Sequence, residues 1–171
     1  MKRTHAVVLS ALVLAACGGM PQSPEEFRKA VPGAMMTKTD SYEVNRSMQA
    51  VGATFQKRAP ECLGVQVRTV SQTSTSYQNI LTTYKPTVVV TGERAELHLQ
   101  QLHKGGGVIY PQKPPEGGVY IIVVDAYPVS SNRARIQLYG PSLSAYDVVY
   151  RAIRGWATGE NLGCPDMAKI R

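Results

Sequence analysis

Two stretches of the chain carry apolar residues at the spacing of one helical face. Over residues 41–58 apolar side chains recur every three or four positions (Val44, Met48, Val51 and Phe55), which predicts an amphipathic helix. Asp40 and Glu43 resemble its N-terminal cap, and Pro60 is expected to end it. A second helix is predicted to begin near Ser144, because a similar apolar stripe follows: Tyr146, Val149, Tyr150, Ile153 and Trp156.

Between these helices, shorter runs have the composition and alternation of strands. Val90 and Ala95 are predicted to pair across a tight turn at Gly92-Glu93, which places Val88 opposite Leu97. Strands are predicted in five segments: residues 65–70, 77–91, 95–99, 119–127 and 133–139.

These elements predict an α+β domain over residues 41–171. An antiparallel β-meander of about five strands would pack one face against two amphipathic helices, one N-terminal and one C-terminal, in two layers. Residues 17–40 are rich in glycine and proline and are expected to form a tether with one short helical stub. Ser23 and Glu26 fit the start of that stub, and Phe27 and Val31 share a face. The sequence leaves open whether the stub docks on the domain or stays free.

The first 16 residues have the pattern of a cleaved signal. Lys2 and Arg3 precede an apolar run over residues 6–16, which is too short to span a bilayer because a spanning helix needs roughly 20 apolar residues. The run ends in Leu14-Ala15-Ala16-Cys17, which resembles the bacterial lipobox. This resemblance implies cleavage before Cys17 and attachment of acyl chains to that cysteine, which together anchor the chain stably in a membrane.

Three further segments stand out near the cysteines and the predicted last helix. They are Pro60-Glu61-Cys62-Leu63, Tyr139-Gly140-Pro141-Ser142 with Ile153-Arg154-Gly155-Trp156, and Asn161-Leu162-Gly163-Cys164-Pro165. With the lipobox they resemble the short, uncharacterised lipoproteins of proteobacterial envelopes. The resemblance implies no particular activity. In enteric-type sorting, an Asp directly after the lipidated cysteine retains a lipoprotein at the inner membrane. This chain has Gly18 there, which by resemblance implies the outer membrane. The domain is expected to face the periplasm.

The three cysteines are predicted to have two different roles. Cys17 would carry lipid, which leaves Cys62 and Cys164 as an even pair in an oxidising compartment. We therefore predict a disulfide between them, which would close a loop of about 100 residues. Two free thiols or a redox role are the alternatives, although the chain has no Cys-x-x-Cys motif.

Composition and motifs favour no catalytic or cofactor chemistry. The formal net charge of +7 falls to +5 once Lys2 and Arg3 are removed, and no basic–aromatic cluster of the kind that tracks nucleic acid is present. No catalytic residue, cofactor or metal is predicted, because His98 and His103 are expected on opposite faces of a strand. Asp125, the one acid in an apolar strand, is interpreted as the partner of Arg135 rather than as a tuned catalytic carboxylate.

One strand is apolar on both faces, and this feature motivates the functional hypotheses. Residues Val119, Ile121, Val123 and Tyr127 are predicted to face away from the helices. An exposed apolar stripe would mark an interaction site, so the first hypothesis is a non-enzymatic accessory module with an envelope protein as partner. The alternative is a carrier or sensor of a small apolar or anionic ligand held under the Gly/Pro-rich loop at residues 104–118.

Overall fold

The computed structural model describes residues 19–72, 74, 77–105 and 108–170, which form a six-stranded antiparallel sheet and three α-helices. The expected signal segment and Cys17 lie outside the described residues. Short 3₁₀ turns occupy Val31–Gly33, Ser144–Tyr146 and Met167–Lys169. The main elements in chain order are α1 (Pro24–Ala30), β1 (Thr37–Val44), α2 (Met48–Leu63), β2 (Gln66–Gln72), β3 (Tyr77–Val90), β4 (Ala95–Gly105), β5 (Val119–Ser130), β6 (Arg133–Pro141) and α3 (Asp147–Thr158).

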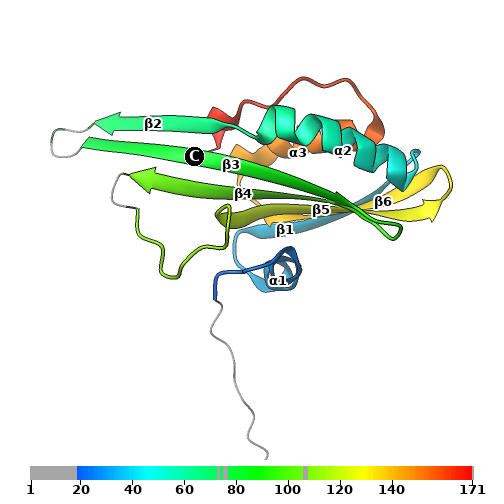
Figure 1. The fold of residues 1–171 in the computed structure, drawn as a ribbon, viewed down its shortest axis with the longest axis horizontal. Coiled ribbons are helices and arrows are strands. Elements are labelled where there is room, and N and C mark those ends of the chain that lie inside the picture. The colour runs from blue at the N-terminus through cyan, green and yellow to red at the C-terminus, as the bar shows by residue number, and fades with distance from the viewer. Residues whose placement is uncertain (1–18, 73, 75–76, 106–107, 171) are drawn as a thin grey trace, which may run out of the picture.

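The sheet has the strand order β1-β6-β5-β4-β3-β2, with each neighbouring pair antiparallel. The helices α2 and α3 lie side by side against one face, and α1 lies against the other (Figure 1). We call these the inner and the outer face. The α+β architecture with an antiparallel sheet and two helices on one face is therefore present, with one strand more than predicted. No helix among the described residues is long and apolar enough to cross a membrane.

The additional strand, β1, was missed because two of its four inward side chains, Lys38 and Asp40, are charged. It pairs with β6 over its whole length, with Val44 opposite Ala134. Asp40 and Glu43, expected to cap a helix, lie within this strand, and the predicted boundary at residue 40 falls inside it. The helix α2 begins later, at Met48, where the Ser47 hydroxyl accepts a hydrogen bond from the Ala50 amide.

The core fills the space between the inner face and the two helices. Met48, Val51 and Phe55 of α2 are fully buried, as the predicted helical face requires. From α3, Ile153 and Trp156 are buried against the same core. In the sheet, the predicted pairing of Val90 with Ala95 and of Val88 with Leu97 is confirmed.

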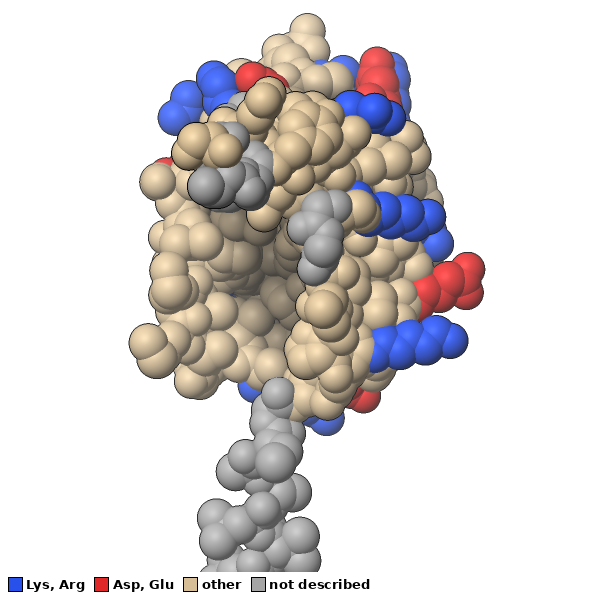
Figure 2. Space-filling model, turned by 90° about the vertical axis from the view of Figure 1, so that its left-hand side faces the viewer, with Lys and Arg blue, Asp and Glu red and all other residues tan. Residues whose placement is uncertain are grey.

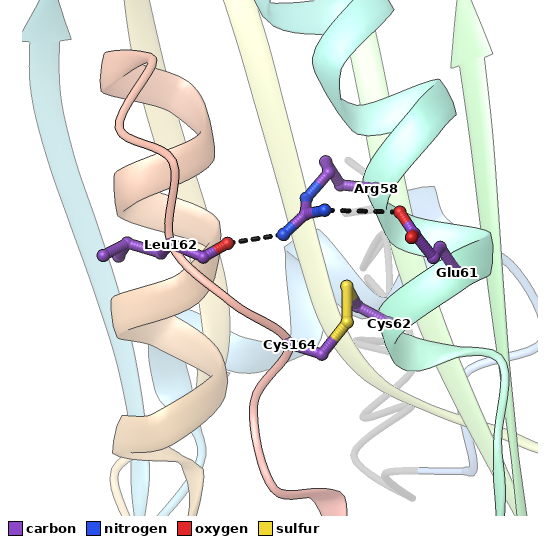
Figure 3. Close-up of a disulfide and its surroundings, with 5 residues drawn as sticks. All are labelled: Arg58, Glu61, Cys62, Leu162 and Cys164. Atoms are coloured by element: carbon purple, nitrogen blue, oxygen red, sulfur yellow. Dashed lines mark hydrogen bonds and ion pairs between the residues drawn. A yellow bond between two sulfur atoms is a disulfide. The ribbon is translucent and has the colours of Figure 1, made fainter.

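A disulfide fastens the C-terminal tail to α2 (Figure 3). The sulfur atoms of Cys62 and Cys164 are bonded, with 4.8 Å between the Cα atoms, so the structure has the predicted pairing. Arg58 lies beside it, where its guanidinium pairs with Glu61 and donates a hydrogen bond to the Leu162 carbonyl (Figure 3). The tail is thus held to α2 by one covalent and one polar link.

Two irregularities in β5 change the predicted register. Ile121 is an extra residue opposite the Leu99/Gln100 step of β4, and this bulge turns Ile121 and Val119 toward the inner core. A second shift, between Pro128 and Ser130, places Tyr127 opposite Arg135. The predicted pair of Asp125 with Arg135 is therefore wrong.

Candidate functional site

The predicted interaction face is divided by the bulge and is largely covered. Val119 and Ile121 turn inward, Val123 is fully buried, and Tyr127 is half-buried on the outer face. Val123 lies beneath α1, where it contacts Phe27 and Val31 together with the rings of Tyr120 and Tyr139. The expectation of an exposed apolar stripe is therefore wrong, because the helical stub docks on it.

A buried ion-pair network fixes α1 to the sheet. Arg28 donates from Nε and Nη2 to the two carboxylate oxygens of Asp125, at 2.6 and 2.7 Å, and from Nη2 to Glu96. The Asp125 side chain is 0% exposed, and those of Glu96 and Arg28 are 7% and 12% exposed. Arg94 and His98 add contacts to Glu96 at 3.1 and 3.0 Å. Asp125 thus forms a salt bridge, as expected, but with a residue 97 positions away in the sequence.

The two carboxylates respond differently to this environment. Burial opposes ionisation of Glu96, but hydrogen bonds from His98 and Arg28 outweigh it and lower its pKa to about 2. Burial raises the pKa of Asp125 above its ordinary value, although the Arg28 hydrogen bonds act in the opposite direction. Both carboxylates, Glu96 and Asp125, are thus held against the Arg28 guanidinium beneath α1.

An open hollow lies on the inner face, at the end of the sheet where β2, β3 and β4 extend beyond the helices. It has a volume of about 330 Å³, and we call it the end hollow. Figure 2 looks onto this end of the molecule, where the surface is hollowed between mainly uncharged residues. Its lining consists of Thr69, Ile80, Thr82, His103, Val108 and Ile170.

Two of the three polar side chains described in the end hollow, Thr82 and His103, are paired with each other. Thr82 Oγ1 lies 2.8 Å from His103 Nδ1, and both residues face inward because they are opposite each other on β3 and β4. Burial lowers the pKa of His103 below its ordinary value, which favours the neutral imidazole. The described residues that line the hollow are therefore uncharged at neutral pH.

The predicted ligand-binding loop closes one side of this hollow. Gln101 is the last β4 residue that pairs with β5, and β4 extends four residues beyond it, so the His103 amide has no β5 partner. That amide instead donates to the Tyr110 hydroxyl at 2.7 Å. Further along, the Gln100 side-chain amide donates to the carbonyls of Glu116 and Gly118. These bonds fasten the loop to β4 and place Val108 at the hollow's rim.

Sequence reasoning found some of these residues and missed others. The prediction that His98 and His103 lie on opposite faces is confirmed: His98 lies in the α1 network and His103 in the end hollow. Ile170 and Thr69 carried no recognisable signal, because a C-terminal tail residue and a strand threonine have no motif. Arg28 could have been suspected only from its place on the stub, one position from Phe27.

No protein-family model matches the chain, and no curated protein matches it. Among solved structures, an uncharacterised protein from Bacillus thuringiensis is 11% identical, with coverage of 72% of this chain and 96% of that chain and a TM-score of 0.29. The Mll3558 protein from Rhizobium loti is 10% identical, with coverage of 70% and 90% and a TM-score of 0.30. Scores this low carry no inference about the present fold or function.

Proposed function

We propose that this chain is a lipid-anchored envelope protein, without enzymatic activity, that binds a small, mainly apolar molecule in the end hollow. The observation that carries the proposal is the hollow itself, at about 330 Å³ within the range of small-molecule sites. Ile80, Val108 and Ile170 supply apolar walls, and the Thr82–His103 pair supplies one neutral polar contact. The anchor is the acylated Cys17 expected from the lipobox, which would hold the domain at the outer membrane.

The geometry favours this carrier or sensor function over a protein-interaction module. An interaction module needs an uncovered apolar patch, whereas the outer-face residue Val123 is fully buried beneath α1. A protein partner for that face would first have to displace α1 and break the Arg28 ion pairs. The end hollow requires no such rearrangement.

The test is a titration with N-phenyl-1-naphthylamine, an uncharged apolar probe whose fluorescence rises when it leaves water. We expect saturable binding to the wild-type protein and loss of that binding in Ile80→Phe, because the larger ring fills the hollow. Val70→Phe is the matched control, since Val70 is 55% exposed, lies on the neighbouring strand and does not line the hollow. Equal probe binding by both variants would contradict the proposal.

A further inference from the structure

The turn at the end of α1 exposes apolar side chains on one side, over residues 32–36, while Val31 packs inward against Phe27 and Val123. Residues 30–36 (Ala-Val-Pro-Gly-Ala-Met-Met) contain no charged or hydrogen-bonding side chain. Met35 is 90% exposed and Met36 is 62% exposed, which makes them two of the most exposed large apolar side chains described. Met36 also has a φ of 59°, a conformation that costs a residue with a Cβ some stability. Nothing within the described fold accounts for two methionines at this turn.

This surface continues into an apolar groove beside the first described residue. The groove has a volume of about 470 Å³, and among its described lining residues only Thr37 has a polar side chain. The other lining residues are Gly19, Pro21, Phe27, Ala30, Val31, Gly33 and Ala34. Gly19 therefore lies next to residues 30–36, on the outer side of the sheet where α1 is seen in Figure 1.

The position of Gly19 brings Cys17 close to this surface. Cys17 is two residues before Gly19, so its Cα lies within about 7 Å of the Gly19 Cα whatever the backbone conformation. The Met20 amide donates a hydrogen bond to the Gln112 side chain at 3.1 Å, which links this segment to the loop at residues 104–118. A lipid on Cys17 would thus enter a bilayer immediately beside residues 30–36.

We propose that residues 30–36 form a membrane-contact surface that rests in the lipid interface next to the acyl chains. This inference rests on the proposed lipidation of Cys17. Burial of Met35 and Met36 in the interface removes apolar area from water, as in peripheral proteins with apolar anchors. Lys29, which immediately precedes the segment and is exposed, places positive charge beside it at the level of anionic headgroups. The α2–α3 layer then faces away from the bilayer, since it lies on the opposite face of the sheet (Figure 1).

The test uses the full lipidated protein in vesicles of phosphatidylethanolamine and phosphatidylglycerol. A spin label is attached through Met35→Cys or, as the control on the opposite layer, through Gln56→Cys, which is an exposed position of α2. Collisions with oxygen, which concentrates in lipid, and with a water-soluble nickel chelate are measured by paramagnetic resonance. At position 35 we expect a several-fold loss of nickel collisions on addition of vesicles, with a rise in oxygen collisions, and no change at position 56.

Mass spectrometry of the N-terminal peptide separates the two ways in which the inference can fail. If Cys17 carries no lipid, the anchoring proposal and the membrane-contact surface both fall. If Cys17 is lipidated and the labels at positions 35 and 56 are equally accessible to nickel, the contact surface alone is refuted. A second measurement places the spin label at position 36. Met35→Asp should make this label accessible to nickel in the presence of vesicles, because the added charge opposes insertion into lipid. Val70→Asp, at an exposed position on a distant strand, should leave the label protected.

Discussion

Arg28 is the residue whose removal most directly tests how α1 is held on the sheet. In Arg28→Met the two buried carboxylates lose the cation that hydrogen-bonds to both. Breaking a buried ion pair by removing one partner typically costs about 3–5 kcal/mol, because the remaining charge is left without compensation. Arg94 still lies 3.1 Å from Glu96 and 3.9 Å from Asp125, so we expect the lower end, about 3 kcal/mol.

The loss has an upper limit set by the docking of α1. If the helix detaches instead of leaving the charges buried, water reaches Asp125 and the penalty becomes the lost burial of Phe27 and Val31. Full burial of such side chains contributes about 1.5–3 kcal/mol each, so detachment would cost a similar or slightly larger amount. Hydrogen exchange of the α1 amides distinguishes the two outcomes, since only detachment abolishes their protection.

The assay is urea unfolding followed by the fluorescence of Trp156, the one tryptophan, which is 1% exposed. Arg135→Met is the matched control, because Arg135 is 52% exposed and pairs with Glu43, itself 40% exposed. Its cost should stay below about 1 kcal/mol. Adding Asp125→Asn to Arg28→Met should restore part of the loss, since the unpaired buried charge is removed. The reasoning is refuted if Arg28→Met costs no more than the control and α1 keeps its protection.

Three further predictions concern the disulfide, the buried carboxylate and the loop. Replacing Cys62 and Cys164 with serine should lower the free energy of unfolding by about 4–5 kcal/mol, because the bridge closes a separation of 102 residues; equal urea midpoints for reduced and oxidised protein would contradict this. Because the pKa of Glu96 is lowered to about 2 from 4.5 on folding, its ionisation stabilises the protein above pH 4.5. That stability, about 3 kcal/mol, should be lost as the pH falls toward 2, and Glu96→Gln should flatten this part of the stability–pH curve. Gly118→Ala should destabilise by about 2 kcal/mol or more in thermal unfolding, since φ is 106° and a Cβ would lie 2.2 Å from a β4 carbonyl oxygen, whereas Gly92→Ala meets nothing within 4 Å and should be neutral or slightly stabilising.

Local patterns in the sequence were sufficient for the elements that bury a regular apolar stripe. The face of α2 containing Met48, Val51 and Phe55 follows from helical spacing alone, because each of these side chains meets the same core. The β3–β4 register follows from alternation on both sides of a short turn. The disulfide was predictable because the expected lipidation of Cys17 left Cys62 and Cys164 as an even pair.

The features that were missed depend on contacts between distant residues. β1 has Lys38 and Asp40 on its inner side, where the Lys38 ammonium lies 3.9 Å from the centre of the Tyr150 ring and Asp40 pairs with Arg154. The apolar alternation of β1 is confined to Tyr42 and Val44, and the strand forms because β6 pairs with it along its whole length. The bulge at Ile121 has no sequence signal either, since both of its neighbours are apolar.

The same limit applies to the role assigned to residues 17–40. Their glycines and prolines predicted a tether, because tethers are recognised by composition. Composition cannot show that a single arginine, Arg28, has two buried carboxylate partners. In the structure α1 is docked through Arg28, and Met20 is bonded to Gln112, so the described part of this segment contacts the sheet and its loop. If Cys17 is acylated as proposed, only two peptide bonds separate it from Gly19, the first described residue. The orientation of the end hollow relative to the bilayer would then be set by the fold itself, and loss of Arg28 would release that orientation as well as lower stability.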